Sequence, residues 1–402
     1  MKSRWLGLAL SAVGLSAAIA HGQTGYSPTP VGAARLPEPF PITEPLPPMM
    51  SGPLNTNTIP PGPPDALSLP IGHSSAFQTE NYVRPERELY FHVGTFALNR
   101  QTMGNKLIAV ADPIGLDVAQ PLQLGLPPLI NLADVTGHME WGIRTTIGLQ
   151  MENQAIELSG FYMFTGQIGK FAAFPGQIDA LFTNAPFGFE GDNGLWLQAD
   201  TLETQLKTTL GSGELNYRYT TLSVTDFELI LGIRYLDFQE RLDIITNDDS
   251  ISFPGNAGGG DPRRSAVYQV STHNRVLGPQ IGLEFGRMLG KYVSVGLCGK
   301  AEFGPNFVTT EHKLFRGDAF PGFDAQHNQI SMMSQVYELN AYIELHLTDK
   351  CRLRGGYQML WLSDIQVGQD QIEFDLSNHQ GLNNNQGSVF FHGPSVELQL
   401  LF

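Results

Sequence analysis

The stretch Asp226-Phe-Glu-Leu-Ile-Leu-Gly-Ile-Arg-Tyr-Leu236 decides the fold, because its side chains alternate between two chemically different faces. One face is apolar and aromatic, with Phe227, Leu229, Leu231, Ile233 and Tyr235. The other face is largely polar and carries Asp226, Glu228, Ile230, Gly232 and Arg234. Successive side chains of a β-strand point to opposite sides, so this period of two predicts a strand that separates two environments.

Nine other segments of the chain show the same alternation, with aromatic residues and glycine interspersed. A period of two over such segments is typical of strands, and the excess of glycine and proline disfavours long helices. We therefore predict an all-β fold of ten strands, over residues 88–98, 139–150, 154–165, 203–220, 225–239, 266–287, 292–306, 333–347, 352–365 and 388–402.

The connections between these segments alternate in length. Short ones, near residues 151–153, 221–224, 288–291 and 348–351, follow long ones near 99–138, 166–202, 240–265, 307–332 and 366–387. Outer-membrane barrels have an even number of antiparallel strands, short periplasmic turns and long outer loops. The spacing predicts an antiparallel up-and-down transmembrane β-barrel of about ten strands, with twelve as the alternative count.

Aromatic side chains stand where the two edges of a lipid-facing surface are expected. Trp141 begins one predicted strand, Tyr357 and Trp361 share another, and Phe402 ends the last. Transmembrane barrels carry girdles of aromatic residues at both interfaces. A barrel pairs all its backbone groups between strands, so it crosses the membrane without a long apolar run.

Composition excludes several classes of protein. The chain has 402 residues, a formal net charge of −15 and two cysteines. An acidic chain lacks the basic surface that holds nucleic-acid phosphates, so we expect no nucleic-acid partner. Two cysteines can form neither a disulfide framework nor a four-cysteine zinc site.

The N-terminal region predicts secretion. Lys2 and Arg4 precede an apolar run that ends in Ala18-Ile-Ala20, which is the pattern of a secretory signal peptide. Proline-dense stretches follow, and proline donates no backbone hydrogen bond. We predict a signal peptide over 1–20, a Pro-rich disordered linker over 21–86 and an outer-membrane β-barrel over 87–402.

Several stretches, in order, resemble a known family. They include Trp141-Gly-Ile-Arg-Thr-Thr-Ile-Gly-Leu, Leu231-Gly-Ile-Arg-Tyr-Leu-Asp-Phe-Gln-Glu-Arg-Leu, Thr272-His-Asn-Arg-Val-Leu-Gly-Pro-Gln-Ile-Gly-Leu, Tyr337-Glu-Leu-Asn-Ala-Tyr-Ile-Glu-Leu and Arg354-Gly-Gly-Tyr-Gln-Met-Leu-Trp-Leu-Ser-Asp-Ile. From about residue 86 to 402 the chain resembles β-barrel porin family number seven, a planctomycete-type family of outer-membrane barrels. The resemblance implies an outer-membrane location and a porin or transport channel for small solutes. The chain departs from the family pattern at Gln366-Val-Gly-Gln-Asp, where similar sequences often carry Arg-Pro-Gly, and at Pro279.

Strand parity predicts which charged side chains face the interior of the barrel. The set contains nine acids and six bases: Arg144, Glu157, Glu214, Arg218, Asp226, Glu228, Arg234, Glu284, Lys300, Glu302, Glu338, Glu344, Arg352, Arg354 and Glu397. They could line a selective channel, or they could fill the interior as ion pairs, since buried charges must be paired. An interior of about eight strands is filled by side chains whereas porins have about 16 to 18 strands, so ten strands favour the filled alternative.

The predicted outer loops are unexpectedly apolar, as in Leu122-Gln-Leu-Gly-Leu-Pro-Pro-Leu-Ile-Asn-Leu and Phe171-Ala-Ala-Phe-Pro. We expect them to pack on one another over the barrel mouth or inside it. The alternative is that they bind a protein partner or a hydrophobic ligand. The competing function is thus a non-transporting barrel that displays these loops.

No motif in the chain predicts catalysis, a cofactor or a metal. Gly-X-Ser-X-Gly, His-Glu-X-X-His and a P-loop are absent, and Asn247-Asp-Asp-Ser lacks the spacing of a calcium loop. We expect a non-enzyme without cofactor or metal. The expected partners are outer-membrane lipid and the barrel-insertion machinery, reached through the C-terminal strand that ends at Phe402; the oligomeric state is left open.

Overall fold

The computed structural model describes residues 88–101, 103–113, 125–135, 138–183, 196–220, 227–248, 265–317, 322–376 and 385–402. The signal peptide predicted over 1–20 and the linker predicted over 21–86 lie outside these residues. The short turn expected at 221–224 lies outside them as well.

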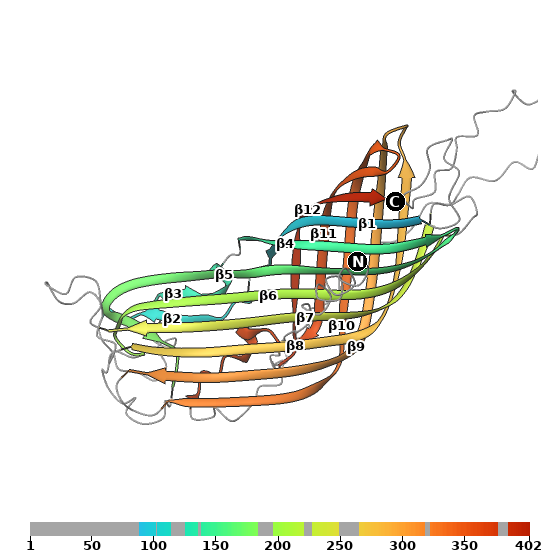
Figure 1. Cartoon of the computed structure of the whole chain (residues 1–402). Coiled ribbons are helices and arrows are strands. Elements are labelled where there is room, and N and C mark those ends of the chain that lie inside the picture. The colour runs from blue at the N-terminus through green and yellow to red at the C-terminus, as the bar shows by residue number, and fades with distance from the viewer. Residues whose placement is uncertain are drawn as a thin grey trace, which may run out of the picture. The chain divides into compact units, whose positions relative to one another are not determined.

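Ten of the strands in the described residues close into an antiparallel barrel (Figure 1). Each pairs with its neighbour along the chain, and β1 pairs with β12 to close the ring. This confirms the predicted all-β transmembrane barrel. The ten are β1 (Glu88–Arg100), β4 (Met139–Met151), β5 (Gln154–Ala180), β6 (Ala199–Thr220), β7 (Phe227–Asn247), β8 (Ser265–Met288), β9 (Val293–Arg316), β10 (Phe323–Thr348), β11 (Cys351–Ile365) and β12 (Gly387–Leu401).

Four short elements lie in the connections at the long-loop end. Strands β2 (Leu107–Ala111) and β3 (Pro128–Asn131) pair with each other, and β2 also pairs with the far end of β5. The elements η2 (Leu132–Asp134) and η4 (Gly368–Gln371) are single turns of 3-10 helix. None of the helices in the described residues has the length and apolar character needed to span a membrane.

Several strands run much further than predicted. Strands β5 to β10 have 21 to 27 residues, whereas β1, β4, β11 and β12 have 13 to 15 (Figure 1). The long loops expected over 166–202, 240–265 and 307–332 are therefore wrong in extent, because strands occupy much of each. The strand residues that were not predicted lie where the pattern of inward and outward side chains reverses, as β7 illustrates.

The pattern of β7 inverts part-way along the strand. Its outward side chains are apolar up to Tyr235 and mostly polar from Asp237, while its inward ones change from Arg234 to mainly apolar residues such as Leu236 and Ile244. We call the part with an apolar outer face the membrane tier. The extensions of β5 to β10 beyond it, together with the elements that they enclose, form the outer tier. A polar outer face over an apolar inner one is the pattern of a sheet in water.

A buried core fills the inside of the outer tier. It contains residues of β2, β3 and η2 and of the segment after β11, packed against the inner faces of β5 to β9: Ile108, Ile130, Leu132, Phe182, Trp196, Leu202, Leu242, Tyr268, Leu314, Ile372 and Leu376 are members. Apolar loop residues thus pack on one another inside the barrel, the first of the two arrangements expected. One predicted loop is wrong: Phe171 and Phe174 belong to β5, where both side chains are exposed.

The membrane tier presents the lipid-facing surface. Trp141 and Trp361 are 60% and 45% exposed, and Phe402, at the end with the short turns, is 63% exposed. Aliphatic side chains between these levels are exposed on neighbouring strands, for example Ile233, Leu283 and Ile343. So wide an apolar surface is costly in water and fits a bilayer with aromatic residues at both interfaces.

Candidate functional site

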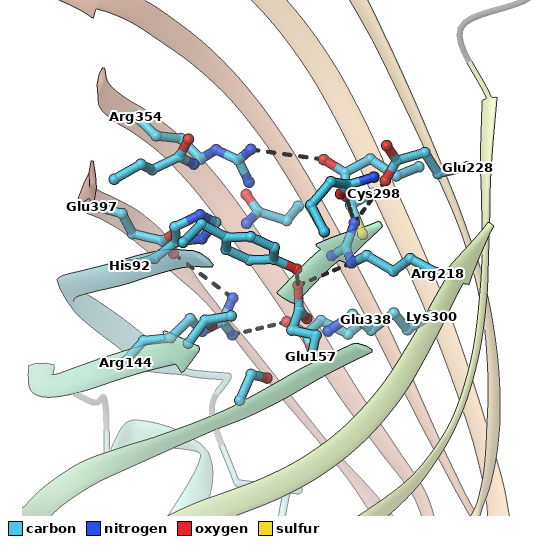
Figure 2. Close-up of a pocket in the computed structure, with 17 residues that line it drawn as sticks. His92, Arg144, Glu157, Arg218, Glu228, Cys298, Lys300, Glu338, Arg354 and Glu397 are labelled. Carbon is cyan, nitrogen blue, oxygen red and sulfur yellow. Dashed lines mark hydrogen bonds and ion pairs between the residues drawn. The ribbon is translucent and has the colours of Figure 1, made fainter. Parts of the chain in front are cut away.

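The predicted interior residues lie together in the membrane tier. Asp226 is outside the described residues, and the other fourteen side chains point to the inner face, where Figure 2 labels eight of them. The alternation of each strand positions them, because their neighbours along the strand face outward and are mostly apolar. Whether they line a path for solutes remains a prediction.

Arg218 on β6 is the centre of the first ion-pair group. Its guanidinium lies 2.9 Å from Glu157 on β5, 3.0 Å from Glu228 on β7 and 2.6 Å from Glu284 on β8. Tyr90 on β1 donates a hydrogen bond of 3.1 Å to Glu157. One cation therefore joins four consecutive strands, β5 to β8, and a tyrosine ties the closing strand to them.

Arg234 on β7 is the centre of the second group and reaches across the lumen. It lies 2.8 Å from Glu338 on β10, 3.6 Å from Glu214 on β6 and 3.7 Å from Glu302 on β9. Lys300 also pairs with Glu214 at 2.8 Å. Because Arg234 is 1% exposed, this network fills the centre of the barrel rather than coating its wall.

The remaining ion pairs link these groups to the seam between β1 and β12. Arg144 on β4 lies 2.8 Å from Glu338 and 3.9 Å from Glu397 on β12. Arg354 on β11 lies 3.4 Å from Glu344 and 3.8 Å from Glu284, and Arg352 also pairs with Glu344. Each of the fourteen described side chains thus has an oppositely charged partner within 4 Å, as buried charges require.

A small polar cavity remains inside this network (Figure 2). The centres of water-sized molecules can occupy about 80 Å³ of it. At roughly 10 to 15 Å³ of such volume for each water, it has room for a few water molecules. Among the described residues no group of three or more His, Cys, Asp or Glu side chains is arranged to hold a metal ion.

An apolar layer closes the barrel between the charged network and the outer core. We call it the middle layer; most of its side chains come from the barrel wall itself, and its buried members are Phe96, Leu98, Phe161, Met163, Leu210, Leu236, Phe238, Val276, Val336, Leu360, Leu362, Ile365, Val367, Val389 and Phe391. Phe96 packs edge-on against Phe161 at 5.7 Å between ring centres, and Phe238 against Phe391 at 5.6 Å. Strand parity was used to place charged residues alone, so this apolar layer was not predicted from the sequence.

The segment that follows β11 enters the barrel above the middle layer. We call residues 366–376 the inserted segment. Arg100 on β1 pairs with Glu240 on β7 at 2.8 Å, and the other oxygen of Glu240 accepts the backbone N–H of Gly368 at 2.9 Å. Lys106 donates to the carbonyl of Gln369 at 2.9 Å. Both Arg100 and Glu240 lie just past the predicted strand ends, in segments that were predicted to be loops.

Burial shifts the pKa values of several titratable groups in the outer tier. Burial lowers the pKa of the Lys106 ammonium and raises that of the Asp370 carboxyl. Burial also lowers the pKa of His312, on the inner face of β9, to about 4. These shifts indicate that the inserted segment and the surrounding wall form a folded interior with little water.

Comparison with protein families identifies the chain. The model of the family described as "Putative beta barrel porin-7" matches residues 123–390. The chain belongs to this family. The porin-7 match covers β3 to β11 and the first residues of β12, so it includes the inserted segment and most of the charged network and of the middle layer; Phe96, Leu98, Phe391 and Glu397 lie outside it. The resemblance noted in the sequence is therefore confirmed.

Other comparisons add fold relationships only. No curated protein matches the chain. Among solved structures, the porin-7 barrel is similar to the outer membrane protease OmpT of Escherichia coli, with 12% identity, 81% of this chain and 100% of that chain covered, and a TM-score of 0.37.

It is also similar to the Pseudomonas putida toluene transporter TodX (10% identity, 82% and 96% covered, TM-score 0.31) and to a FadL homologue of Pseudomonas aeruginosa (11%, 79% and 90%, TM-score 0.31). At these identities and scores the similarity does not extend to activity or substrate.

Proposed function

We propose that this outer-membrane β-barrel is a non-conducting scaffold that holds its outer tier above the membrane surface. The observation that carries the proposal is the middle layer. Most of its members are wall side chains, so it stays in place whatever position the loops adopt. A hydrophobic constriction stops ions by excluding water.

Two further barriers support the same function. On one side of the middle layer the charged side chains pair with each other within 4 Å and leave room for a few water molecules. On the other side the inserted segment and the outer core occupy the barrel. Solutes would have to pass three filled layers in succession.

Conductance in planar lipid bilayers tests the proposal. We expect the folded protein, identified by its heat-dependent mobility in detergent gels, to give no steady channel events. A variant with residues 366–386 replaced by a short Gly-Ser linker should also stay closed. Adding Phe161→Ser and Phe391→Ser to that variant should raise its ion leak, because the layer that excludes water is then removed, whereas adding Phe174→Ser, an exposed site on β5, should not.

A channel for small solutes is the second candidate, favoured by the family name and by the polar cavity in the charged network. Steady conductance of the unmodified protein would support this candidate and refute the scaffold. Conductance of the linker variant alone would show that the inserted segment is a gate and that the middle layer is no barrier. The absence of an enzymatic activity and recognition by the insertion machinery through β12 stay predictions.

A further inference from the structure

One charged side chain among the described residues lies on the lipid-facing surface of the membrane tier. Of the Asp, Glu, Lys and Arg residues that the structure describes in the strands of this tier, only Arg287 on β8 points outward, where it is exposed. Its direction follows from the alternation of the strand, because Leu283 and Phe285 are exposed on the lipid-facing side while Glu284 is buried inside. An ionisable residue on a surface that otherwise rejects charge is a candidate site whose partner has to be identified.

The outward side chains around Arg287 are apolar. Val295 lies directly opposite on β9, and Phe285 precedes Arg287 on the same face of β8. Leu289 and Tyr292, in the turn that joins β8 to β9, are both 61% exposed. None of these side chains has a carboxylate, and Arg287 has no acidic partner within 4 Å among the residues that the structure describes. An anion that pairs with this guanidinium therefore comes from outside the described part of the chain.

The position of Arg287 along its strand places it at the level of the lipid headgroups. Arg287 is the last residue but one of β8, at the end with the short turns, which is the periplasmic end of an outer-membrane barrel. Lys291, in the turn that follows, has its ammonium 5.4 Å from the ring centre of Tyr292. Asp349, in the turn between β10 and β11, lies within 4 Å of neither cation. Long basic side chains near the ends of spanning segments reach the interface, where basic residues and anionic lipids attract each other.

We propose that Arg287 binds the phosphate of an anionic phospholipid in the periplasmic leaflet, and that the charge of Lys291 strengthens this attraction. The acyl chains of the lipid lie along the apolar side chains of β8 and β9, of which Phe285 and Leu297 are direct neighbours. A second copy of the chain is a poorer partner, because the lipid-facing surface of the described strands offers no carboxylate to Arg287. The inference concerns the outside of the barrel alone, so a conducting barrel would leave it unchanged.

Native mass spectrometry of the full chain in a neutral detergent tests the site, with phosphatidylglycerol and phosphatidylcholine as the probes. We expect the protein to bind phosphatidylglycerol more tightly. Arg287→Gln should weaken that binding roughly fivefold, since one basic residue near an anionic lipid surface contributes about that factor. Lys291→Gln should weaken it by a smaller factor, and Arg287→Lys, which keeps the charge, should retain most of it. Phosphatidylcholine binding should not change.

Arg241→Gln is the matched control, because it removes the same charge from an outward side chain, 48% exposed, at the other end of the barrel. Its phosphatidylglycerol binding should equal that of the unmodified protein, and heat-dependent mobility in gels verifies that every variant is folded. Equal binding of the two lipids, or an equal loss in Arg241→Gln, would overturn the proposal. Full displacement of the lipid by millimolar glycerol 3-phosphate would overturn the assignment to a lipid. A dimer that Arg287→Gln dissociates would assign Arg287 to a contact between copies instead.

Discussion

Replacing Arg234 by methionine tests the energetic role of the charged network. Methionine keeps much of the length of the side chain and removes its charge and donors. The guanidinium of Arg234 lies within 4 Å of Glu338, Glu214 and Glu302, and its Nε donates to Ser212 at 2.9 Å. Removing the guanidinium affects the three carboxylates unequally, because they differ in the other cations that lie near them.

The expected loss of unfolding free energy follows from the cation partners that each carboxylate keeps. Glu338 keeps Arg144 at 2.8 Å, and Glu214 keeps Lys300 at 2.8 Å. Glu302 has no other cation within 4 Å among the described residues, so Arg234→Met leaves its buried carboxyl group without a partner. Such a loss costs about 3 to 5 kcal/mol of unfolding free energy. Adding Glu302→Gln should recover more than half of it.

Unfolding by guanidinium in detergent micelles, followed by heat-dependent gel mobility, measures the effect. With a slope of roughly 4 kcal/mol per molar guanidinium, the midpoint should fall by about 1 M. Arg241→Met is the control on the same strand: its side chain is 48% exposed, and exposed pairs contribute about 0 to 1 kcal/mol.

One result would refute the reasoning. If Arg234→Met changes the unfolding free energy by less than about 1 kcal/mol, the network behaves as a surface ion pair does and the interior of the membrane tier is far more hydrated than its small cavity allows. The same result would weaken the scaffold proposal, because a hydrated interior is what a channel requires.

Three other changes have defined outcomes. Gly148→Ala should lower the melting temperature, because the ring of Tyr90 occupies the place of the new methyl group, whereas Gly213→Ala, with open space at that position, should be nearly neutral. Phe182→Ala should cost about 3 to 5 kcal/mol, measured as faster hydrogen exchange in β2, since it removes a fully buried ring from the outer core. His312 has a folded pKa of about 4 against an ordinary 6.5, so the unfolded chain binds more protons between these values. The unfolding free energy should therefore fall by about 3 kcal/mol as pH drops from 6.5 to 4, and His312→Gln should abolish this loss in pH titrations of stability.

The direction of each side chain could be predicted from the sequence in the membrane tier, where the barrel wall separates the lipid from a charged interior. Arg234 and Tyr235 are adjacent in the chain, and their contrast is enough to predict which face each occupies. The contrast arises from two environments with opposite requirements: hydrocarbon rejects the guanidinium, and the ionic interior needs it. The inward placement of the charged residues therefore followed from parity, but which of them pair across the lumen did not, since that depends on the closure of the sheet.

The outer tier could not be predicted in the same way. Past Tyr235 the apolar parity changes sides, and in β5 a register shift between Met163 and Gly166 changes the parity of the residues that follow. A pattern that reverses within one strand looks like the end of that strand. Strands β2 and β3 have five and four residues, too few for a period to stand out, and their place depends on pairing with the far end of β5.

The seam between β1 and β12 has a consequence for assembly. It pairs Tyr90 with Leu401, so it joins the two ends of the barrel sequence and carries the largest loop-closure entropy of the strand pairings. Arg144 on β4 and Glu397 on β12 face each other across that seam at 3.9 Å. Until the ring closes, this pair stays apart and the polar interior stays hydrated. Closing the seam and expelling the water from the interior are thus one coupled step, late in folding, and a barrel with a misaligned seam retains unpaired charges that favour its reopening.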